Sequence, residues 1–353
     1  MLLEHNNYSV GIDISDQSVK MVQLKKKRGK PILVSYNYKS IPKGMIERGI
    51  IQNKKKFSEY IKNLLEKPIG KRIQTKKIVV NVPEEQTFTK IISVPIDKEE
   101  NLYANVLNET SKHIPMNLDE SYLDWQVTGI LGKEQSVFVA AVPKKIADDF
   151  ADAIIESGCE PIVFEVESVA ILRALGEKTF SSPTLVIDFG HSKSNVAIAD
   201  KNSLDLTMSI PLSGDTINQT VSQKLKLTVE QAEKAKIQCG LDKEKCKGAL
   251  RIVLDAALDD LAYKLNDAIE FYAEKHGGSK SISTIIITGG GANFLNIEEV
   301  LGLKTKKTVA QGNGLLNINE EDAKALFKKK GVSPHFFTLA IGLALRGFAE
   351  KTI

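Results

Sequence analysis

Two distant segments of the chain share one pattern, in which an apolar run ends in an aspartate and a short turn follows. The first segment, "VGIDISDQSVK", contains Asp13, and the second, "TLVIDFGHSKSN", contains Asp188. Each turn leads into another apolar run and then into a similar phrase, "SIPKG" at 40–44 and "SIPLSG" at 209–214. Strand–turn–strand signals are common, so one such echo can arise by chance. The matching second phrase favours an internal duplication, and the chain is expected to fold as two related domains.

Length and composition agree with this expectation. The 353 residues suggest about two domains, and 42% hydrophobic with 26% charged residues is usual for a soluble globular protein. The net charge is only +4, and the short basic runs at 25–28, 54–56 and 328–330 have no interleaved aromatic residues. We interpret these runs as solvated surface and expect no nucleic-acid partner.

Neither a secretion signal nor a membrane span is visible. The N-terminal "MLLEHNNYSV" lacks a basic region followed by an apolar core, and no stretch approaches the about 20 apolar residues that cross a bilayer. Cys159, Cys239 and Cys246 form no CxxC pair and have no metal-ligand spacing. Sparse cysteines in odd number are typical of a reducing cytosol. We therefore expect a cytoplasmic protein that reaches a membrane only through a partner.

The predicted secondary structure follows the same order in both halves. Three meandering strands precede a helix, and further helices and strands follow, which is typical of mixed sheets flanked by helices in an α/β architecture. Thr228 and Gln231 have the spacing of a capping box that starts a helix ending at Gly240. The predicted strands are 9–14, 20–25, 32–39, 77–82, 184–188, 195–199, 204–210 and 282–288, and the predicted helices are 57–66, 216–226, 254–275 and 336–348.

A segment with its own pattern lies between the halves. Its predicted order is strand, helix, two strands, helix and strand, which resembles a small inserted α+β module. The last helix and strand could equally belong to the sheet of the first half. The predicted ranges are 88–94, 99–113, 122–130, 136–142, 144–157 and 161–166.

The turns after Asp13 and Asp188 have the chemistry of phosphate loops. Small residues let backbone N–H groups approach an anion closely, and Lys20 can add a positive charge. The two aspartates would repel phosphate, so we expect them to hold Mg²⁺, in part through its waters. Each turn taken alone is more often a plain connection than a ligand site, and so is the triple glycine at 289–291. Their order along the chain is what indicates a nucleotide.

Other nucleotide and catalytic templates fit poorly. The chain has no GxxxxGK[ST] and no GxGxxG that opens a helix after a strand, which argues against P-loop and Rossmann sites. HExxH is absent, the five histidines do not cluster, and no nucleophile elbow is present.

The order strand–Asp–turn, inserted module, strand–Asp–Phe–Gly turn and strand–Thr–Gly–Gly–Gly resembles the actin-like ATPase superfamily over nearly the whole chain. This superfamily includes actin, DnaK-type chaperones, sugar kinases and FtsA. The resemblance implies ATP or ADP with Mg²⁺ as cofactors and an α/β actin-like fold, with connecting helices in "FEVESVAILRAL" and "HFFTLAIGLALRGF". The implied boundaries are 1–85, 143–180 and 335–353 for domain 1, 86–142 for the inserted subdomain, and 181–334 for domain 2.

The resemblance also assigns the site residues motif by motif. "GIDISDQSVK" and "VIDFGHSKSN" are similar to the two phosphate loops, "PLSGDTIN" to the turn after the second loop, and "IIITGGGANF" to the adenosine motif. In "AEKAKI", Glu233 and Lys236 match chaperone residues beside the adenine and ribose, and Glu167 matches the catalytic glutamate. The implied nucleotide contacts are Asp13, Ser15, Gln17, Lys20, Asp188, Gly190, His191, Ser192, Gly214, Glu233, Lys236, Gly289, Gly290 and Gly291, with Asp13 and Asp188 also at the metal.

Within the superfamily the sequence is similar to the PilM family of type IV pilus assembly proteins. The phrases "KIISVPIDKEEN", "HIPMNLDESYLDWQV", "VFVAAVPKK" and "LAIGLALR" carry this similarity, and most of them lie in the inserted subdomain of the FtsA/PilM type. The resemblance implies a partner, the N-terminal cytoplasmic segment of the inner-membrane protein PilN, in a groove between domain 1 and the inserted subdomain. It also allows a homo-oligomer.

Two alternatives remain on the same fold. An FtsA-like cell-division protein would carry an amphipathic membrane-targeting helix, whereas this sequence ends directly after the second connecting helix. A small-molecule kinase would need a substrate cleft, and the small module argues against the usual kinase elaborations.

Two departures from the superfamily pattern predict that hydrolysis is slow. The first loop has Ser15-Asp16-Gln17 where chaperones have Gly-Thr-Thr, which adds an acid beside the phosphates. His191 stands where actin has an aspartate. ATP binding is better supported than hydrolysis, and at most a slow ATPase is expected, with Glu167 as the candidate residue to orient a water.

Overall fold

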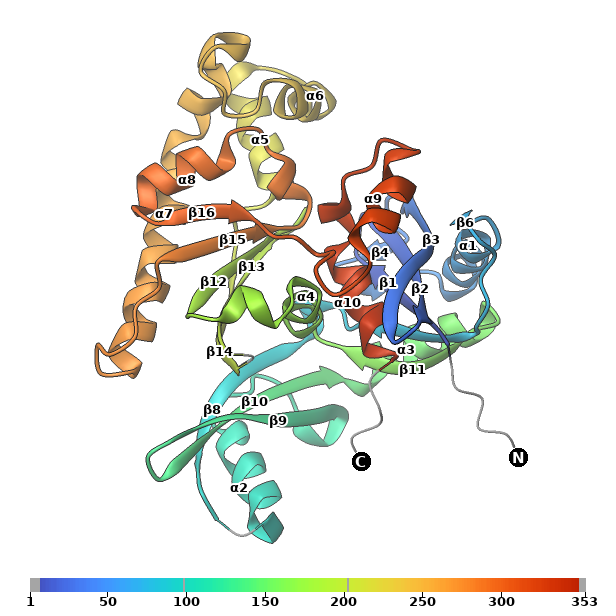
Figure 1. Cartoon of the computed structure of the whole chain (residues 1–353), viewed down its shortest axis with the longest axis vertical. Helices are drawn as coiled ribbons and strands as arrows, with labels where there is room; N and C mark the ends of the chain where they lie inside the picture. Colours follow the sequence, from blue (N-terminus) through green and yellow to red (C-terminus); the bar gives the residue numbers. More distant parts are fainter. Residues whose placement is uncertain (1–6, 98, 202, 349–353) are drawn as a thin grey trace. The chain divides into compact units, whose positions relative to one another are not determined.

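The computed structural model describes residues 7–97, 99–201 and 203–348 (Figure 1). The chain divides into two compact units, Met1–Gly176 with Gly314–Ile353, and Glu177–Asn313. The sequence-based boundary lay at 334/335, whereas the compact units place residues 314–334 with the first unit. The reason is that α9 (Glu320–Lys328) packs on the first sheet, where the Phe327 ring lies 4.7 Å from the Tyr36 ring, centroid to centroid.

The first unit is built on a six-stranded mixed sheet in the order β11-β7-β1-β2-β3-β6. Helices α1 and α3 cover one face, and α4, α9 and α10 cover the other. The strands are β1 (Tyr8–Ile14), β2 (Ser18–Lys27), β3 (Lys30–Ser40), β6 (Ile69–Gly70), β7 (Lys77–Asn81) and β11 (Glu160–Glu165), and the helices are α1 (Lys54–Glu66), α3 (Lys144–Glu156), α4 (Glu167–Leu175) and α10 (Thr338–Arg346). A short hairpin, β4 (Ile46–Glu47) and β5 (Ile50–Ile51), precedes α1.

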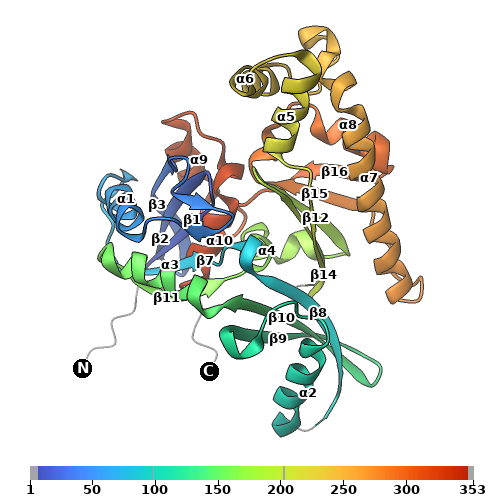
Figure 2. The ribbon, with the colours of Figure 1, turned by 180° about the vertical axis from the view of Figure 1, so that it is seen from behind.

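The inserted segment forms a sheet of its own. Its strands β8 (Phe88–Pro95), β9 (Ser121–Leu131) and β10 (Glu134–Pro143) are antiparallel in the order β8-β10-β9. Helix α2 (Glu99–Ser111) covers one face (Figure 2), and its Val106 packs in a small separate core. The helix and strand that follow, α3 and β11, belong to the first sheet, because β11 pairs in parallel with β7. This pairing decides the alternative that the sequence left open.

The second unit repeats the strand arrangement of the first. Strand β1 is antiparallel to β2 and parallel to β7, and β12 is likewise antiparallel to β13 and parallel to β15. The five-stranded order is β14-β13-β12-β15-β16. The strands are β12 (Thr184–Phe189), β13 (Ser194–Asp200), β14 (Ser203–Ile210), β15 (Thr284–Thr288) and β16 (Thr308–Gln311). The matching topology confirms the predicted α/β duplication.

Helices pack on the second sheet through one large apolar core. They are α5 (Gly214–Leu225), α6 (Val229–Cys239), α7 (Ala249–Lys275) and α8 (Ile297–Thr305), with α7 and α8 side by side (Figure 1). The capping box of Thr228 and Gln231 is confirmed at the start of α6. None of the helices within the described residues is both long and apolar enough to cross a bilayer.

Two predicted helices have different bounds in the structure. Helix α7 begins at Ala249 rather than 254, because Leu250 already packs in the core directly after Gly248. The final helix predicted at 336–348 divides into a 3₁₀ turn, Pro334–Phe337, and α10. In that 3₁₀ turn, Phe337 is buried against Tyr36 and Phe327, so aromatic packing sets the local backbone.

Arg173 on α4 joins three elements of the first unit. Its Nη1 and Nη2 donate to the two carboxylate oxygens of Glu165 at 2.6 and 2.5 Å, and Nη1 also donates to the carbonyl of Gly342 on α10 at 3.1 Å. The Glu165 side chain is only 10% exposed. Without Arg173, the one basic partner left to this carboxylate among the described residues would be Arg346, whose Nε lies 3.6 Å from Oε1.

Replacing Arg173 by Met should therefore lower the free energy of unfolding of the first unit. We expect a loss of about 2 to 3 kcal/mol, below the range for a fully buried pair because solvent screens Arg173 in part. Arg251→Met is the matched control, since its pair with Glu299 is 3.5 Å long and Glu299 is 52% exposed. The control should lose less than about 1 kcal/mol. Equal losses in urea unfolding followed by circular dichroism would contradict this assignment.

Candidate functional site

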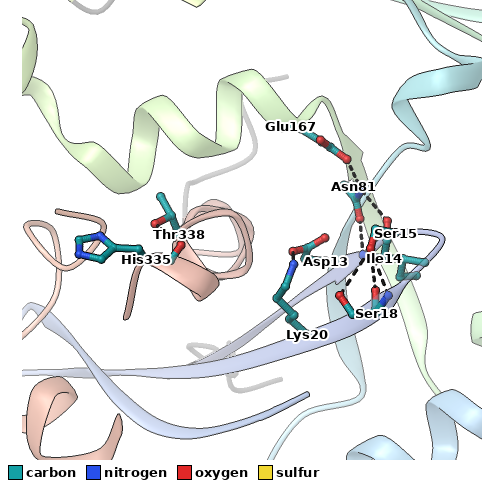
Figure 3. A network of polar contacts seen from close by, with 9 residues as sticks. All are labelled: Asp13, Ile14, Ser15, Ser18, Lys20, Asn81, Glu167, His335 and Thr338. Atoms are coloured by element: carbon teal, nitrogen blue, oxygen red, sulfur yellow. Dashed lines mark hydrogen bonds and ion pairs between the residues drawn. The ribbon is translucent and has the colours of Figure 1, made fainter. Parts of the chain in front are cut away.

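The first predicted phosphate turn follows β1 directly (Figure 3). The Ser15 N–H donates to the carbonyl of Ser18 at 3.0 Å, and the Ser18 N–H donates to Ser15 Oγ at 3.2 Å. The turn is therefore closed by its own backbone and one hydroxyl. Gln17 lies at its exposed tip.

Asp13 and Lys20 face each other across the β1–β2 hairpin. The register of the hairpin pairs these two residues, and Lys20 Nζ lies 2.6 Å from Asp13 Oδ2. Asp13 is 3% exposed. The ammonium also lies 4.6 Å from the centroid of the Phe336 ring, which adds a cation–π contact. The structure thus brings the predicted metal-holding acid and the predicted phosphate-binding cation into one ion pair.

Asn81 at the end of β7 connects the turn to Glu167. Its Oδ1 accepts from the Ile14 N–H at 2.8 Å, and its Nδ2 donates to the Ile14 carbonyl at 3.0 Å and to Glu167 Oε1 at 2.8 Å (Figure 3). Asn81 is 1% exposed. The sequence analysis missed this residue. The available signal was a polar residue that ends the otherwise apolar strand "KIVVN".

The Asp16 side chain binds the β4–β5 turn of the first unit. Its two carboxylate oxygens accept from the backbone N–H groups of Arg48 and Gly49 at 2.7 and 3.0 Å. The sequence analysis expected this acid to lie beside the phosphates. Both its oxygens hold the β4–β5 turn against the first loop, and its place beside a phosphate stays a prediction.

The second predicted phosphate turn joins β12 to β13. The Gly214 N–H donates to the Gly190 carbonyl at 3.0 Å, and the Asp215 N–H donates to the His191 carbonyl at 2.9 Å. Helix α5 therefore begins on this turn, with its N-cap Ser213 in a capping box. His191 and Ser192 are exposed at the tip of the turn.

The triple glycine after β15 packs against the end of β12. Gly289 has φ +78°, and a Cβ there would overlap Asp188 Oδ1. A Cβ at Gly291 would overlap the Phe189 ring. At Gly290 the same Cβ would meet no atom within 4 Å. Packing alone thus requires two of the three glycines, and it brings this turn to Asp188.

Glu233 and Lys236 lie on one face of α6, as their spacing predicted. Lys236 Nζ is 2.6 Å from Glu233 Oε2, and Asn218 Nδ2 also donates to this oxygen. Burial alone would raise the pKa of Glu233, but the hydrogen bonds from Lys236 and Asn218 and the charges of Lys236 and His191 hold it below its usual value. The Glu233 carboxylate is therefore ionised at neutral pH.

Only the backbone of Gly214, with no side chain, lies between Lys236 and the second predicted phosphate turn. A Cβ added at Gly214 would lie 3.5 Å from Lys236 Nζ and 3.6 Å from His191 Cα. A glycine here leaves this space open, as an anion held by backbone N–H groups requires. Among the described residues, no group of three or more His, Cys, Asp or Glu side chains could hold a metal ion.

Comparison with known proteins agrees with this arrangement. A solved PilM–PilN type IV pilus biogenesis complex matches with TM-score 0.82 at 20% identity, over 97% of this chain and 99% of that chain. The ethanolamine utilization protein EutJ from Carboxydothermus hydrogenoformans matches with TM-score 0.58 at 15% identity, over 96% and 89% of the two chains. MreB5 of Spiroplasma citri bound to ADP matches with TM-score 0.53 at 14% identity, over 92% and 97%.

These similarities confirm the predicted actin-like fold. The family model described as type IV pilus assembly protein PilM matches residues 11–348, which include the inserted subdomain as well as both predicted phosphate turns. This coverage does not favour the division-protein or kinase alternatives. The duplicated strand ends, the inserted sheet and the family match agree, and the chain belongs to the PilM family of type IV pilus assembly proteins.

Proposed function

We propose that this protein binds ATP or ADP with Mg²⁺ in the cytoplasm and docks the N-terminal cytoplasmic segment of PilN during type IV pilus assembly. The observation that carries the nucleotide part is the duplicated strand end. In each unit an aspartate is the second-last residue of an apolar strand, a tight turn follows the strand, and a lysine, Lys20 or Lys236, lies near the turn. Membrane association would come through PilN.

In this proposal the two turns hold the phosphates and Lys20 neutralises them. Asp13 and Asp188 hold Mg²⁺, in part through water, because Mg²⁺ keeps several of its waters in proteins. Glu233 and Lys236 contact the ribose and adenine together with the glycine turn. When bound, Mg²⁺ would neutralise phosphate charge. Lys20 must exchange its contact with Asp13 for one with phosphate.

Calorimetry with Lys20→Ala tests the nucleotide site. We expect ATP binding to weaken by about 1 to 3 kcal/mol, as for loss of a charge-assisted hydrogen bond. Lys27→Ala is the matched control, because Lys27 lies exposed on the same strand. Asp13→Asn should weaken ATP binding measured with Mg²⁺ more than ATP binding measured in EDTA, where no Mg²⁺ is available. Unchanged affinity in both variants would refute the site.

Hydrolysis should be slow even when ATP is bound. Glu167 is the candidate to orient the attacking water, and its carboxylate already accepts from Asn81. His191 stands where actin has an aspartate, and Asp13 and Asp188 are assigned to Mg²⁺, so none of these three is assigned to activate the water. We expect phosphate release well below the enzymatic median of about 10 per second, and a further decrease in Glu167→Gln at unchanged ATP affinity. A rate near that median, or a wild-type rate in the variant, would contradict this prediction.

PilN docking is proposed where the inserted subdomain joins the rest of the first unit. Tyr122 on β9 is 49% exposed, and its hydroxyl donates to Asp148 on α3 at 3.1 Å. Lys144 Nζ donates to the Asp119 carbonyl at 2.8 Å. Strands β8 and β9 are the two edges of the module sheet, and extended peptides commonly add to such edges or lie in adjoining apolar grooves.

Fluorescence anisotropy tests the docking directly. A labelled peptide with the sequence of the N-terminal cytoplasmic segment of PilN from the same organism should bind the protein saturably. A scrambled peptide of the same composition is the control, since it keeps charge and hydrophobicity. Equal binding of both peptides would refute specific docking.

A further inference from the structure

The chain contains a thiol pair that the nucleotide site does not use. The structure joins Cys239, the last residue of α6, to Cys246 in a disulfide, with the two Cα atoms 5.8 Å apart. Only six residues separate the two cysteines in the chain. The sequence analysis did not predict this pair, because it contains no CxxC spacing. The third cysteine, Cys159, is free in the first unit.

The two sulfurs differ in accessibility. Cys239 is 3% exposed and packs in the apolar core of the second unit, whereas Cys246 is exposed. Exposed lysines, Lys245 and Lys247, flank Cys246 in the chain. Lysine ammonium groups stabilise a neighbouring thiolate, which is the reactive form. A soluble reagent would therefore reach Cys246 first, and Cys239 would be protected from it.

The backbone around Cys246 is held in a costly conformation. Cys246 (φ 50°, ψ 31°), Lys247 (φ 55°, ψ 32°) and Gly248 (φ 66°, ψ 12°) are three successive left-handed residues. The left-handed region is unfavourable for residues other than glycine, because Cβ comes too close to the backbone there. The disulfide to Cys239 restrains Cys246 and so opposes a change of this backbone to a more favourable conformation. We expect the turn to change conformation more easily when the disulfide is reduced.

Cys239 transmits this constraint to α6. The Gly240 N–H caps the helix by donating to the Lys236 carbonyl at 3.1 Å, and the Leu241 N–H donates to the Leu295 carbonyl at 2.8 Å. Cys239 thus lies within one helical turn of Lys236. The disulfide joins the end of the helix that carries Glu233 and Lys236 to the turn at Lys245–Gly248, which precedes α7.

We propose that Cys239 and Cys246 are a reversible thiol–disulfide exchange site whose oxidation orders the α6–α7 connection. The oxidant is a low-molecular-weight disulfide of the glutathione class. The Cys246 thiolate attacks one sulfur of that disulfide, its S–S bond breaks, and one thiolate leaves. The deprotonated Cys239 then attacks the Cys246 sulfur and releases the second thiolate. Two electrons pass from the cysteines to the small disulfide, and the two released thiolates take up the two protons.

Thiol counting tests the exchange. Protein treated with oxidised glutathione, and separately with excess dithiothreitol, is denatured, alkylated with iodoacetamide and weighed by mass spectrometry. Of the three cysteines in the chain, we expect one adduct, on Cys159, after oxidation and three after reduction. The Cys159→Ser variant should give no adduct after oxidation and two adducts after reduction. Three adducts in the oxidised wild-type protein would overturn the proposal. A mixed disulfide with glutathione that persists on Cys246 would also overturn it.

Limited trypsin digestion tests the ordering without any nucleotide. Lys243, Lys245 and Lys247 are exposed in this connection. We expect reduction to speed cleavage after them by about ten-fold or more, because local opening controls proteolysis of an ordered segment. Cys246→Ser should be cleaved at the reduced rate in both conditions, and Cys159→Ser should respond like wild type. Equal cleavage of oxidised and reduced wild-type protein would overturn the proposal.

A final arm, which rests on the proposed function, measures ATP affinity in both redox forms. Reduction should weaken binding by about five-fold, at the lower end of usual coupling energies. Equal affinity in the two forms would refute the link between the disulfide and Lys236. Absence of ATP binding in both forms would refute the proposed function instead, and the thiol and trypsin results would still decide the exchange site.

Discussion

Deleting residues 86–142, with Glu85 and Pro143 rejoined by a short Gly–Ser linker, should abolish binding of the PilN segment. The module contributes one side of the proposed docking surface, including Tyr122 and both edges of its sheet. Its apolar core is separate from the core between the first sheet and α1 and α3, and among the described residues of that second core the deletion removes only Val142, so most of its packing is retained. ATP affinity should change by no more than about two- to three-fold, as expected for independent sites.

Fluorescence anisotropy with the labelled PilN peptide measures the loss, and calorimetry with ATP controls for folding. Tyr122→Ser is a smaller change at the same surface. It should weaken binding of the PilN peptide and leave the ATP affinity unchanged. Peptide binding to the deletion variant as tight as to the full-length protein would place the docking surface elsewhere on the chain.

Gly342→Ala should be among the most destabilising single-methyl changes in the first unit. A Cβ at this position would overlap the backbone carbonyl of Ala170 on α4. On the other side of α10, a Cβ at Gly11 on β1 would overlap the backbone of Ala340 and Ala344. Helix α10 therefore touches both neighbours with its backbone and cannot move away from either. We expect a loss of about 3 kcal/mol, at the upper end of overpacking costs.

Gly302→Ala on α8 is the matched control for this change. It adds the same methyl group inside a helix, but its nearest neighbour there is the Lys307 carbonyl oxygen at 3.4 Å, an ordinary contact. The control should be neutral or stabilising by up to about 1 kcal/mol, because alanine is the better helix former. Urea unfolding measures both variants. A neutral Gly342→Ala would show that α4 and α10 can separate without cost.

Local signals in the sequence predicted most elements and the strand ends that carry Asp13 and Asp188. Strand alternation, helical periodicity and capping boxes act over a few residues, so each can be recognised without knowledge of the fold. The register that places Asp13 opposite Lys20 is also local, because a tight hairpin sets its own register, although the sequence analysis did not predict their ion pair. The capping box at Thr228 is also a local signal, because its partner Gln231 lies only three residues further along the chain.

Contacts between distant segments were not predictable in the same way. Asn81 lies 67 residues from Ile14 and 86 from Glu167, yet it hydrogen-bonds to both. The oxygens of Asp16 accept from backbone N–H groups more than 30 residues away, and the sequence analysis did not predict these bonds. A polar residue has many possible partners in an unfolded chain, and only tertiary packing selects one of them.

The sequence by itself determined the duplicated strand–aspartate–turn units, the α/β class and the residues present at each turn, because these follow from short-range patterns of apolar, small and charged residues. Only the tertiary structure decided that β11 completes the first sheet, that Gly289 and Gly291 are required by Asp188 and Phe189, and that Cys239 meets Cys246. These outcomes depend on which surfaces pack together and how closely. That choice is made by the burial of the whole core, which no local pattern encodes.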